Sequence, residues 1–206
     1  MKPIKLLIVE DDAAWVTALT SYLNKEEDLQ IVASAVASED AIALYTDLEI
    51  DVVLMDIHLQ GSKLDGIHTA VELNELRTGK IIMLTSASDE QLMRDSFTAG
   101  AINYIDKANF KELPHAIRSA YHRPAAMEVL LKEYARLKRE EQLKQLSQAE
   151  REVFELIEDG YTQSQIGAKL YKAESTLKNQ VNNMLRKLGV KSSKDAVKKV
   201  KRKGLW

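Results

Sequence analysis

Three carboxylates, a hydroxyl and a lysine follow short apolar runs in the first half of this chain. Glu10 and Asp11 come directly after the first run, Asp56 ends the third, Thr85 closes the fourth and Lys107 follows the fifth. Crowded carboxylates repel one another unless a cation joins them, and a hard ion such as Mg²⁺ prefers oxygen ligands. With Thr85 and Lys107 beside them, such a site can hold a phosphoryl group that Asp56 attacks as nucleophile.

A single acid at one of these positions has a second explanation. Acidic residues often follow a strand because they are stabilised at the N-terminus of the next helix. One residue therefore says little. The full set at successive run ends favours a site.

The elements that must position these residues alternate between apolar runs and amphipathic stretches over residues 1–120. Such runs are typical of strands buried on both faces of a parallel sheet. Repeated βα units predict a doubly wound α/β domain, in which ligands bind at the carboxyl ends of the strands. If the first and third strands are neighbours, Glu10, Asp11 and Asp56 converge there. We predict strands at Ile4–Val9, Ile31–Ala35, Val52–Met55, Ile81–Leu84 and Ile102–Ile105, and helices at Ala13–Lys25, Glu39–Leu48, Ile67–Arg77, Glu90–Ala99 and Phe110–Tyr121.

Charge is distributed unevenly over the 206 residues, although the net charge is only -2. Residues 1–120 hold 10 Lys or Arg and 20 Asp or Glu, whereas residues 146–206 hold 13 and 7. This asymmetry predicts two domains with different partners. A basic C-terminal part attracts polyanions, most often nucleic acid, although a solvated basic tail explains the charge equally well.

Several classes of protein are excluded or disfavoured. The chain has no Cys, which rules out disulfides, thiolate zinc sites and a Cys nucleophile. No stretch approaches the roughly 18 apolar residues of a membrane span. The opening MKPIKLLIVEDD runs into acids, unlike a signal peptide. We therefore expect a cytoplasmic protein with no membrane partner.

Residues 122–145 are predicted to form a helical linker. Met127, Leu130, Tyr134 and Leu137 have the 3-4-3 spacing of a coiled-coil seam, which fades at Glu141. Because a confident coiled coil needs sustained heptads, a linker packed on either domain is favoured over a dimer coil.

Residues 146–206 are predicted to be a small all-α domain of four helices. Ser147-x-x-Glu150 and Thr162-x-x-Gln165 are capping-box patterns. The stretches Thr162–Leu170 and Glu174–Leu188 are joined by a short turn and form a helix-turn-helix candidate. The second has a buried face and an opposite face with amides and cations that suit base edges and phosphates, or that merely meet solvent. The buried set is Leu177, Val181, Leu185 and Leu188, and the opposite set is Lys178, Asn179, Asn182, Asn183 and Arg186.

The stretches LLIVEDD, DVVLMDIHL, DGI, IIMLTSAS and AGAINYIDK in residues 1–121 resemble bacterial response-regulator receiver domains, whose fold is flavodoxin-like. The resemblance implies that Asp56 is the phosphoacceptor and that Asp11 and Asp56 ligate Mg²⁺ directly. It implies that Glu10 acts mainly through water and that the carbonyl of His58 is a further ligand. Thr85 would be the switch hydroxyl, Lys107 the phosphate-binding lysine and Tyr104 the rotating aromatic.

The segment from LSQAEREVFELIEDGYTQSQIGAKL to TLKNQVNNMLRKLGVKSSKDAV resembles the LuxR-type helix-turn-helix of NarL/FixJ response regulators. The resemblance implies that Lys178, Asn179 and Asn182 face bases, and that Lys169, Thr176 and Lys187 lie nearer phosphates. The last helix would form a dimer contact through Ala196, Val197 and Val200.

Some positions depart from these families. Ala108 follows Lys107 where receivers often have Pro, the loop after Asp56 is about two residues longer, and Ala87 leaves access to the site open. In the turn LYKAES, Ala173 replaces the usual Ser cap, a loss of about 1 kcal/mol.

These features together predict a phosphorylation-dependent, DNA-binding transcription regulator of a two-component system. A histidine kinase would phosphorylate Asp56, and the chain would dimerise and read inverted half-sites about one helical turn apart. We expect no enzyme activity beyond Mg²⁺-dependent self-phosphorylation from a phosphodonor and autodephosphorylation. A receiver-controlled RNA-binding antiterminator and a protein-interaction regulator are the alternatives.

Overall fold

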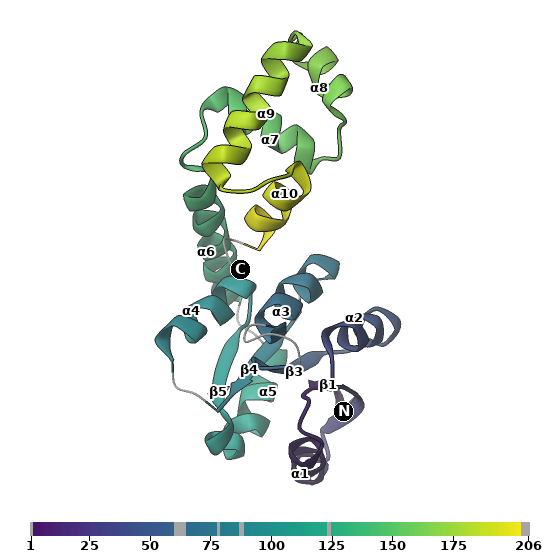
Figure 1. The fold of residues 1–206 in the computed structure, drawn as a ribbon. Coiled ribbons are helices and arrows are strands. Elements are labelled where there is room, and N and C mark those ends of the chain that lie inside the picture. Colours follow the sequence, from purple (N-terminus) through teal and green to yellow (C-terminus); the bar gives the residue numbers. More distant parts are fainter. Residues whose placement is uncertain (1, 60–64, 78, 87–88, 123–124, 203–206) are drawn as a thin grey trace. The chain divides into compact units, whose positions relative to one another are not determined.

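The computed structural model describes residues 2–59, 65–77, 79–86, 89–122 and 125–202. The chain divides into two compact units, residues 1–134 and 135–206 (Figure 1). The division falls inside helix α6, Ala125–Leu143, and so within the predicted linker.

The first unit contains a five-stranded parallel sheet in the order β2-β1-β3-β4-β5. The predicted doubly wound fold is confirmed, and β1 and β3 are neighbours. The strand order reverses between them, which is where open α/β sheets bind ligands. The strands are β1 Ile4–Val9, β2 Leu29–Ala35, β3 Val52–Asp56, β4 Ile81–Thr85 and β5 Asn103–Asp106.

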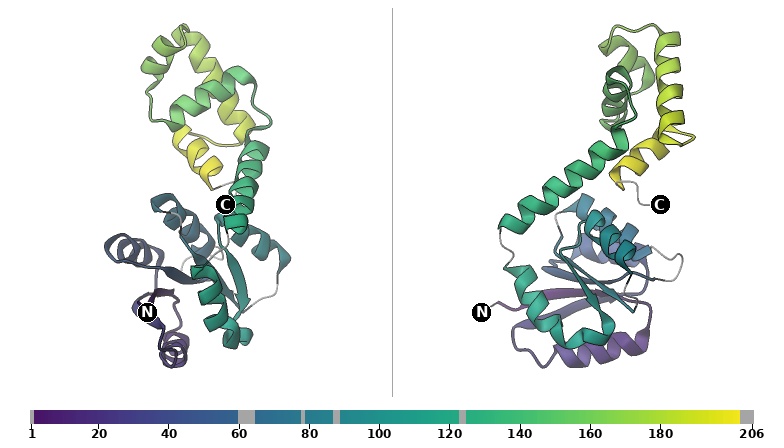
Figure 2. Two further views of the ribbon diagram at one scale, coloured as in Figure 1. Left: turned by 180° about the vertical axis from the view of Figure 1, so that it is seen from behind. Right: turned by 90° about the vertical axis from the view of Figure 1, so that its left-hand side faces the viewer.

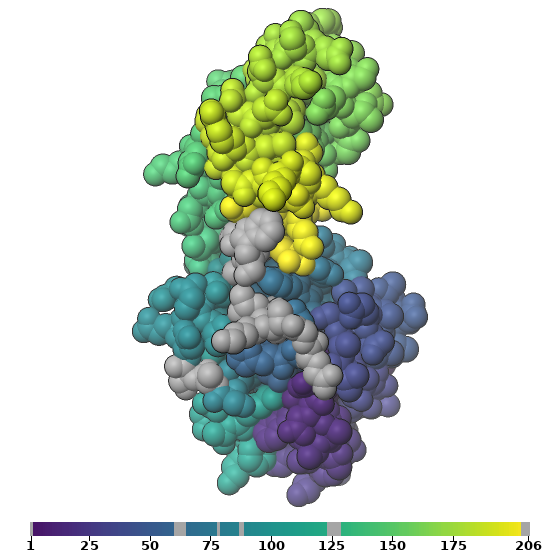
Figure 3. Space-filling view, viewed as in Figure 1, coloured from purple at the N-terminus to yellow at the C-terminus, as the bar shows by residue number. Residues whose placement is uncertain are grey.

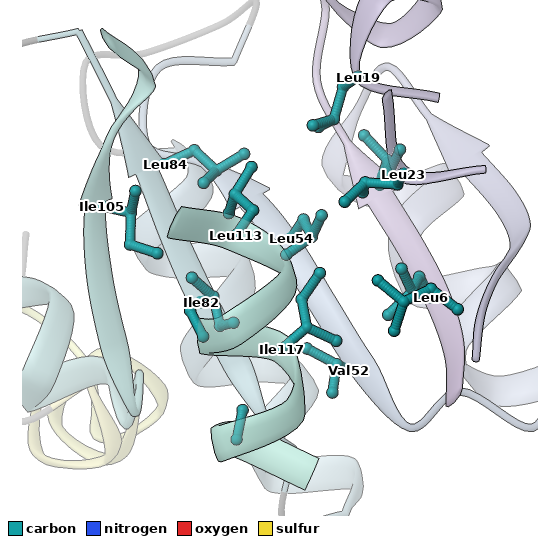
Figure 4. Close-up of a cluster of buried hydrophobic side chains, with 14 of the residues drawn as sticks. Leu6, Leu19, Leu23, Val52, Leu54, Ile82, Leu84, Ile105, Leu113 and Ile117 are labelled. Carbon is teal, nitrogen blue, oxygen red and sulfur yellow. The ribbon is translucent and has the colours of Figure 1, made fainter. Parts of the chain in front are cut away.

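Helices cover both faces of this sheet, with α1 and α5 on one face and α2, α3 and α4 on the other (Figure 1). On the first face, Leu19 and Ile117 pack against Leu54 and other strand residues in a buried apolar cluster (Figure 4). Each fully buried aliphatic side chain stabilises the fold by about 1.5–3 kcal/mol. The helices are α1 Ala13–Leu23, α2 Ser38–Asp47, α3 Asp65–Leu76, α4 Glu90–Ala99 and α5 Leu113–Tyr121, with a 3₁₀ turn η1 over Lys107–Glu112.

The second unit contains a bundle of short helices around its own apolar core (Figure 2). Both predicted capping boxes form, at Ser147 and at Thr162. In α9, Met184 is fully buried and Leu185 only partly, so the predicted inclusion of Leu185 in the buried face needs correction. The 4-3-4 spacing of the observed set follows the helical period more closely. The helices are α7 Gln148–Glu158, α8 Gln163–Lys169, α9 Glu174–Leu188 and α10 Ser193–Lys201.

Helix α6 contributes to both units. The Tyr134 hydroxyl lies 3.2 Å from Thr98 Oγ1 in the first unit, while Arg139 pairs with Glu158 in the second. Of the predicted seam, Leu130 and Leu137 are 64% and 53% exposed, and the side chain of Met127 lies outside the described residues. Within the described ranges, no helix has both the length and the apolar character needed to span a membrane.

Candidate functional site

The carboxyl ends of β1, β3, β4 and β5 meet at one edge of the sheet because the strands are parallel and adjacent. Glu10 and Asp11 follow β1, Asp56 and Thr85 are the last residues of β3 and β4, and Lys107 follows β5. The amide of Glu10 donates to the Ala35 carbonyl, which holds the chain against β2 as it leaves the sheet. The fold thus brings together residues that are about 50 positions apart in the sequence.

Three carboxylates crowd at this edge. One oxygen from each of Glu10, Asp11 and Asp56 lies within 4.8 Å of the others. Glu10 is 1% exposed and Asp56 4% exposed, while Asp11 is half-buried. Glu10 Oε2 is shielded from solvent. A buried, crowded oxygen set of this kind fits a hard divalent cation.

Lys107 already joins two of these carboxylates. Its Nζ donates to Asp56 Oδ2 at 2.9 Å and forms an ion pair with Glu10 Oε2 at 2.6 Å. Burial alone would lower the pKa of Lys107, but its hydrogen bonds and charge interactions with Glu10 and Asp56 outweigh burial and raise the pKa. The lysine therefore stays charged and is available to a further anion beside Asp56.

Glu10 carries the most perturbed carboxyl of the site. The pKa of Glu10 is raised from 4.5 to about 7, mainly by burial and also by the nearby Asp56 charge, and this rise remains although Lys107 and the Asp12 amide lower the pKa. Burial thus disfavours the charged form of Glu10, and a cation at this edge would favour it.

Thr85 and Tyr104 lie on neighbouring strands. Thr85 is fully buried and pairs in register with Asp106, while the half-buried Tyr104 pairs with Met83. Residues two apart on a strand share a face of the sheet, so Thr85 and Tyr104 belong to the same face. This placement suits the predicted pair of switch residues.

His58 lies just beyond Asp56. Its backbone amide donates to Asp56 Oδ1 at 3.2 Å, and the residue is exposed. The loop after Asp56 that was predicted to be longer continues into residues 60–64. Ala87, which was predicted to leave access to the site open, follows β4. Residues 60–64 and Ala87 lie outside the described residues.

The backbone after Lys107 needs no proline. The Lys107–Ala108 peptide is trans, and Asp106 Oδ1 accepts a hydrogen bond from the Ala108 amide at 2.8 Å. Phe110 in the same turn packs edge-on against Trp15 of α1, with ring centroids 6.2 Å apart. Lys107 Nζ lies 5.7 Å from the Trp15 ring centroid.

Two residues near the site were missed by sequence reasoning. Trp15 had no assigned role, although it follows Asp11 by one helical turn. Gly66 was noted only as part of the DGI motif. A Cβ at Gly66 would lie 1.8 Å from the Asp56 carbonyl oxygen, so only glycine lets α3 start this close to β3. A lone glycine directly before a predicted helix was the available signal.

In the second unit, the predicted base-reading side chains occupy one exposed face of α9. Lys178, Asn179 and Asn182 are exposed, as is Thr176 at the start of the helix. Arg186 donates to Asn183 Oδ1 at 3.2 Å on the same face. The arrangement presents amides and cations to a partner outside the domain.

The turn before α9 lacks a side-chain cap, as predicted. Ala173 at the N-cap makes no side-chain hydrogen bond to the helix. Tyr171, two residues earlier, has φ 52 and is 97% exposed. A non-glycine residue in this left-handed region is strained, so the turn is held by its surroundings rather than by its own sequence.

The two predicted phosphate-contacting lysines have partners inside the unit. Lys187 Nζ pairs with Glu150 Oε2 at 2.6 Å. Lys169 Nζ donates to the Tyr161 hydroxyl at 3.1 Å and lies 4.2 Å from that ring's centroid. Lys169 is exposed, but the charge of Lys187 is largely neutralised by Glu150.

The predicted dimer contact on α10 requires correction. Ala196 and Val200 are 0% and 1% exposed and belong to the core of their own unit, and Val197 packs against that core. The spacing correctly indicated an apolar face, but this face is already covered by α7 and α9. Ala196 and Val200 are therefore not open to a second copy.

Comparisons with known proteins agree with this geometry. Residues 6–118 match the response regulator receiver domain family, and residues 144–200 match the luxR family of bacterial regulatory proteins. The response regulator protein VraR of Staphylococcus epidermidis is 30% identical over 199 residues, 94% of each chain. VraR of Staphylococcus saprophyticus is 30% identical over 200 residues, 95% of each chain.

Solved structures show the same folds. The Salmonella typhimurium RcsB response regulator is 22% identical with a TM-score of 0.55, covering 96% of this chain and 98% of its own. A LuxR-family two-component response regulator from Aurantimonas sp. SI85-9A1 is 23% identical with a TM-score of 0.56, covering 59% of this chain and 86% of its own. The chain therefore belongs to the two-component response regulators, with a receiver domain followed by a LuxR-type DNA-binding domain, the architecture of a transcription factor.

Proposed function

We propose that Asp56 accepts a phosphoryl group from a histidine kinase and that this event controls DNA binding by α9 in the cytoplasm. The observation that carries the proposal is the setting of Asp56. Its carboxylate ends β3 between the acidic pair Glu10 and Asp11 and the ammonium of Lys107, which lies 2.9 Å away. A nucleophile with a cation on one side and an oxygen-ligand set on the other suits phosphoryl transfer.

The residues present fit a Mg²⁺ ion. The crowding of three carboxylates and the raised pKa of Glu10 both favour a divalent cation here. Asp11 and Asp56 would hold the ion directly, Glu10 through water, and the His58 carbonyl would complete the protein ligands. When bound, Mg²⁺ supplies positive charge for the carboxylates and the phosphoryl oxygens.

In the transfer step, an Asp56 oxygen forms a bond to phosphorus as the nitrogen–phosphorus bond of the kinase's phosphohistidine breaks. Lys107 then exchanges its contact with the Asp56 carboxylate for a phosphoryl oxygen, which its charge stabilises. The Thr85 hydroxyl turns toward another phosphoryl oxygen, and Tyr104 on the same face of the sheet follows. This exchange shifts an existing equilibrium toward an active surface.

The output is sequence-specific binding of double-stranded DNA by dimers at inverted half-sites. Lys178, Asn179 and Asn182 would contact base edges, and Thr176 and Lys169 phosphates. The RcsB structures, which share this fold, are described in terms of DNA interaction. The exposure of the α9 face supports the same role here.

The test combines labelling with selection of bound nucleic acid. Purified protein is incubated with a labelled small phosphodonor and Mg²⁺, beside Asp56→Asn and the exposed control Asp40→Asn. We expect label in the wild type and the control but none in Asp56→Asn; full labelling of Asp56→Asn would overturn the assignment.

The same preparations are then offered sheared genomic DNA and total RNA. A DNA pool with an inverted motif, enriched after phosphorylation, is expected. An RNA pool would instead favour antitermination. Recovery of neither would favour a protein-interaction output.

A further inference from the structure

The positive charge of the second unit is concentrated at its end and is not on the recognition helix. Residues 146–190 hold six Lys or Arg and six Asp or Glu, which cancel. Residues 191–206 hold seven Lys or Arg and a single acid, Asp195. The part of the domain that includes α9 is therefore neutral overall, and long-range attraction of a polyanion must come from the segment that contains α10.

The lysines of this segment form a stripe. Lys194, Lys198 and Lys201 are spaced by four and three residues, so they share one face of α10, and all three are exposed. Lys191, which precedes the helix cap Ser192, is also exposed. The buried Ala196 and Val200 anchor the other face of the helix. The space-filling view shows the yellow α10 segment at the surface of the second unit (Figure 3).

The charges of Lys191, Lys194 and Lys198 are not neutralised locally. No carboxylate of the described residues pairs with Lys191, Lys194 or Lys198. Asp195 instead accepts a hydrogen bond from the Ser192 hydroxyl at 2.7 Å in the helix cap. Lys187, in contrast, is paired with Glu150. Uncompensated like charges along a helix repel one another, and an anionic partner relieves that repulsion.

The helix is rigidly joined to the recognition helix. Lys199, which lies beside the stripe, donates to the Leu188 carbonyl at the end of α9 at 2.8 Å, and α10 packs against both α9 and α7. An anion bound along α10 is therefore placed at a fixed position relative to the base-reading face. From Lys194 to Lys201 the helix rises ~10 Å, about the axial rise of three nucleotides in one DNA strand.

We propose that the face of α10 carrying Lys194, Lys198 and Lys201, together with Lys191 just before the helix, binds the phosphate backbone of the same DNA duplex that α9 reads. This inference rests on the proposed DNA-binding function. It assigns to α10 the sequence-independent part of the affinity, with α9 supplying specificity. A cationic face also repels its own copy, so α10 contacts DNA rather than a second chain through this surface.

The experiment measures how the affinity for DNA depends on salt. The full chain and the triple variant Lys191→Gln, Lys194→Gln, Lys198→Gln are titrated onto a selected operator and onto unrelated duplex DNA between about 50 and 200 mM salt, a range in which phosphate contacts dominate the dependence. The control variant Lys2→Gln, Lys25→Gln, Lys111→Gln removes the same charge from exposed sites of the first unit.

We expect the slope of log affinity against log salt to become less steep in the triple variant, by roughly 0.9 for each lost phosphate contact and so by about 3. The reduction should be equal on both DNAs, and the control should retain the wild-type slope. Thermal unfolding checks that the exposed substitutions leave the fold intact.

An unchanged slope in the triple variant, with wild-type DNA binding, would overturn this inference and leave the proposed function standing. A changed monomer–dimer equilibrium with the slope unchanged would instead make α10 a dimer surface. Loss of RNA or anionic-vesicle binding without a DNA effect would assign the stripe to that partner. Absence of DNA binding in the wild type would overturn the proposed function as well.

Discussion

The receiver site and the recognition face of α9 are built in opposite ways. At the receiver site, Glu10 and Asp56 are almost fully buried, come from different strands and restrain each other through Lys107. On α9, Lys178, Asn179 and Asn182 come from one helix and are exposed. The receiver site therefore depends on the packing of its domain. The side chains on α9 lie on a surface that does not contribute to the core.

This difference has a physical origin. Charged groups can be buried only when they are paired and hydrogen-bonded, so chemistry at a sheet edge demands tertiary neighbours. A surface that reads a large polyanion must remain open to it. We therefore expect substitutions at the receiver site to change stability and function together, and substitutions on α9 to change binding alone.

Gly66→Ala should have the largest effect on stability. The new Cβ would stand 1.8 Å from the Asp56 carbonyl oxygen, which forces a backbone shift at the site. We expect a loss of at least about 3 kcal/mol in urea unfolding of the first unit.

Gly160→Ala in the second unit is the matched control. Gly160 has φ +86, and no described atom lies within 4 Å of its added Cβ. The substitution therefore costs only the strain of placing alanine in a left-handed backbone conformation, roughly 1 kcal/mol of unfolding free energy. Equal losses for the two variants would contradict the close approach at Asp56.

Lys107→Met should cause the next largest loss of stability. It leaves Glu10 and Asp56 buried without their ammonium partner, and breaking such a pair costs about 3 kcal/mol. Urea unfolding without Mg²⁺ measures this loss. Added Mg²⁺ should recover part of it, because an ion that binds only the folded state stabilises that state.

Lys178→Met is the matched substitution on the exposed face of α9. We expect it to change the free energy of unfolding by no more than about 0.5 kcal/mol. A Lys107→Met protein as stable as the wild type would mean that the receiver site is no more restrained than the α9 surface.

Lys178→Ala and Asn182→Ala test binding without stability. Each should weaken specific DNA binding by about 1–3 kcal/mol for the lost base contact, while thermal unfolding stays unchanged because both side chains are exposed. Fluorescence anisotropy with the selected operator measures the effect. Wild-type affinity in both variants would remove this face from the DNA model.

Glu150→Gln should have the smallest effect of these substitutions. It tests a charge in the second unit that, unlike those on the exposed face of α9, is buried and paired. Glu150 closes the capping box with Ser147 and pairs with Lys187. Burial alone would raise the pKa of Glu150, but the bonds from Lys187 and Ser147 outweigh it and hold the pKa below 4.5. A carboxyl whose pKa is lowered in the folded state stabilises that state fully at pH values above its unfolded pKa, which is near 4.5. That stability is lost as the pH falls through the folded-state pKa.

We expect Glu150→Gln to cost about 1 kcal/mol at pH 7, the usual worth of a helix cap. The difference from the wild type should shrink as pH falls below 4.5. The exposed control Glu152→Gln should show neither effect in urea unfolding across this pH range. A difference for Glu150→Gln that grows in acid would contradict the assigned ion pair.

Much of the fold was predictable because local patterns and global fold agree. The apolar runs located all five strands within a few residues, and the capping boxes located the starts of α7 and α8. At the site, the prediction that Glu10, Asp11 and Asp56 converge depended on β1 and β3 being neighbours, which the sheet order confirms. The roles of these residues stay proposals until they are tested.

The failures occurred where a side chain's environment depends on distant parts of the chain. Ala196 and Val200 were predicted to face a second copy, because an apolar face in sequence does not reveal whether its cover is another chain or the same one. Lys187 was predicted to lie near phosphates, and its ion pair with Glu150, 37 residues away, was not foreseen. Gly66 was overlooked because its neighbour, the Asp56 carbonyl, is adjacent only in space.

The sequence by itself determined the periodicity, the helix caps, the order of chemical groups along the chain and the separation of acidic and basic halves, because these are local or additive properties. Only the tertiary structure decided which charges are paired and which remain open. Lys107 and Lys187 are ordinary lysines in sequence, yet each is held by buried carboxylates. Lys194 and Lys198 have no such partner among the described residues. Pairing depends on distances of a few ångströms between residues far apart in the chain, and folding alone sets those distances.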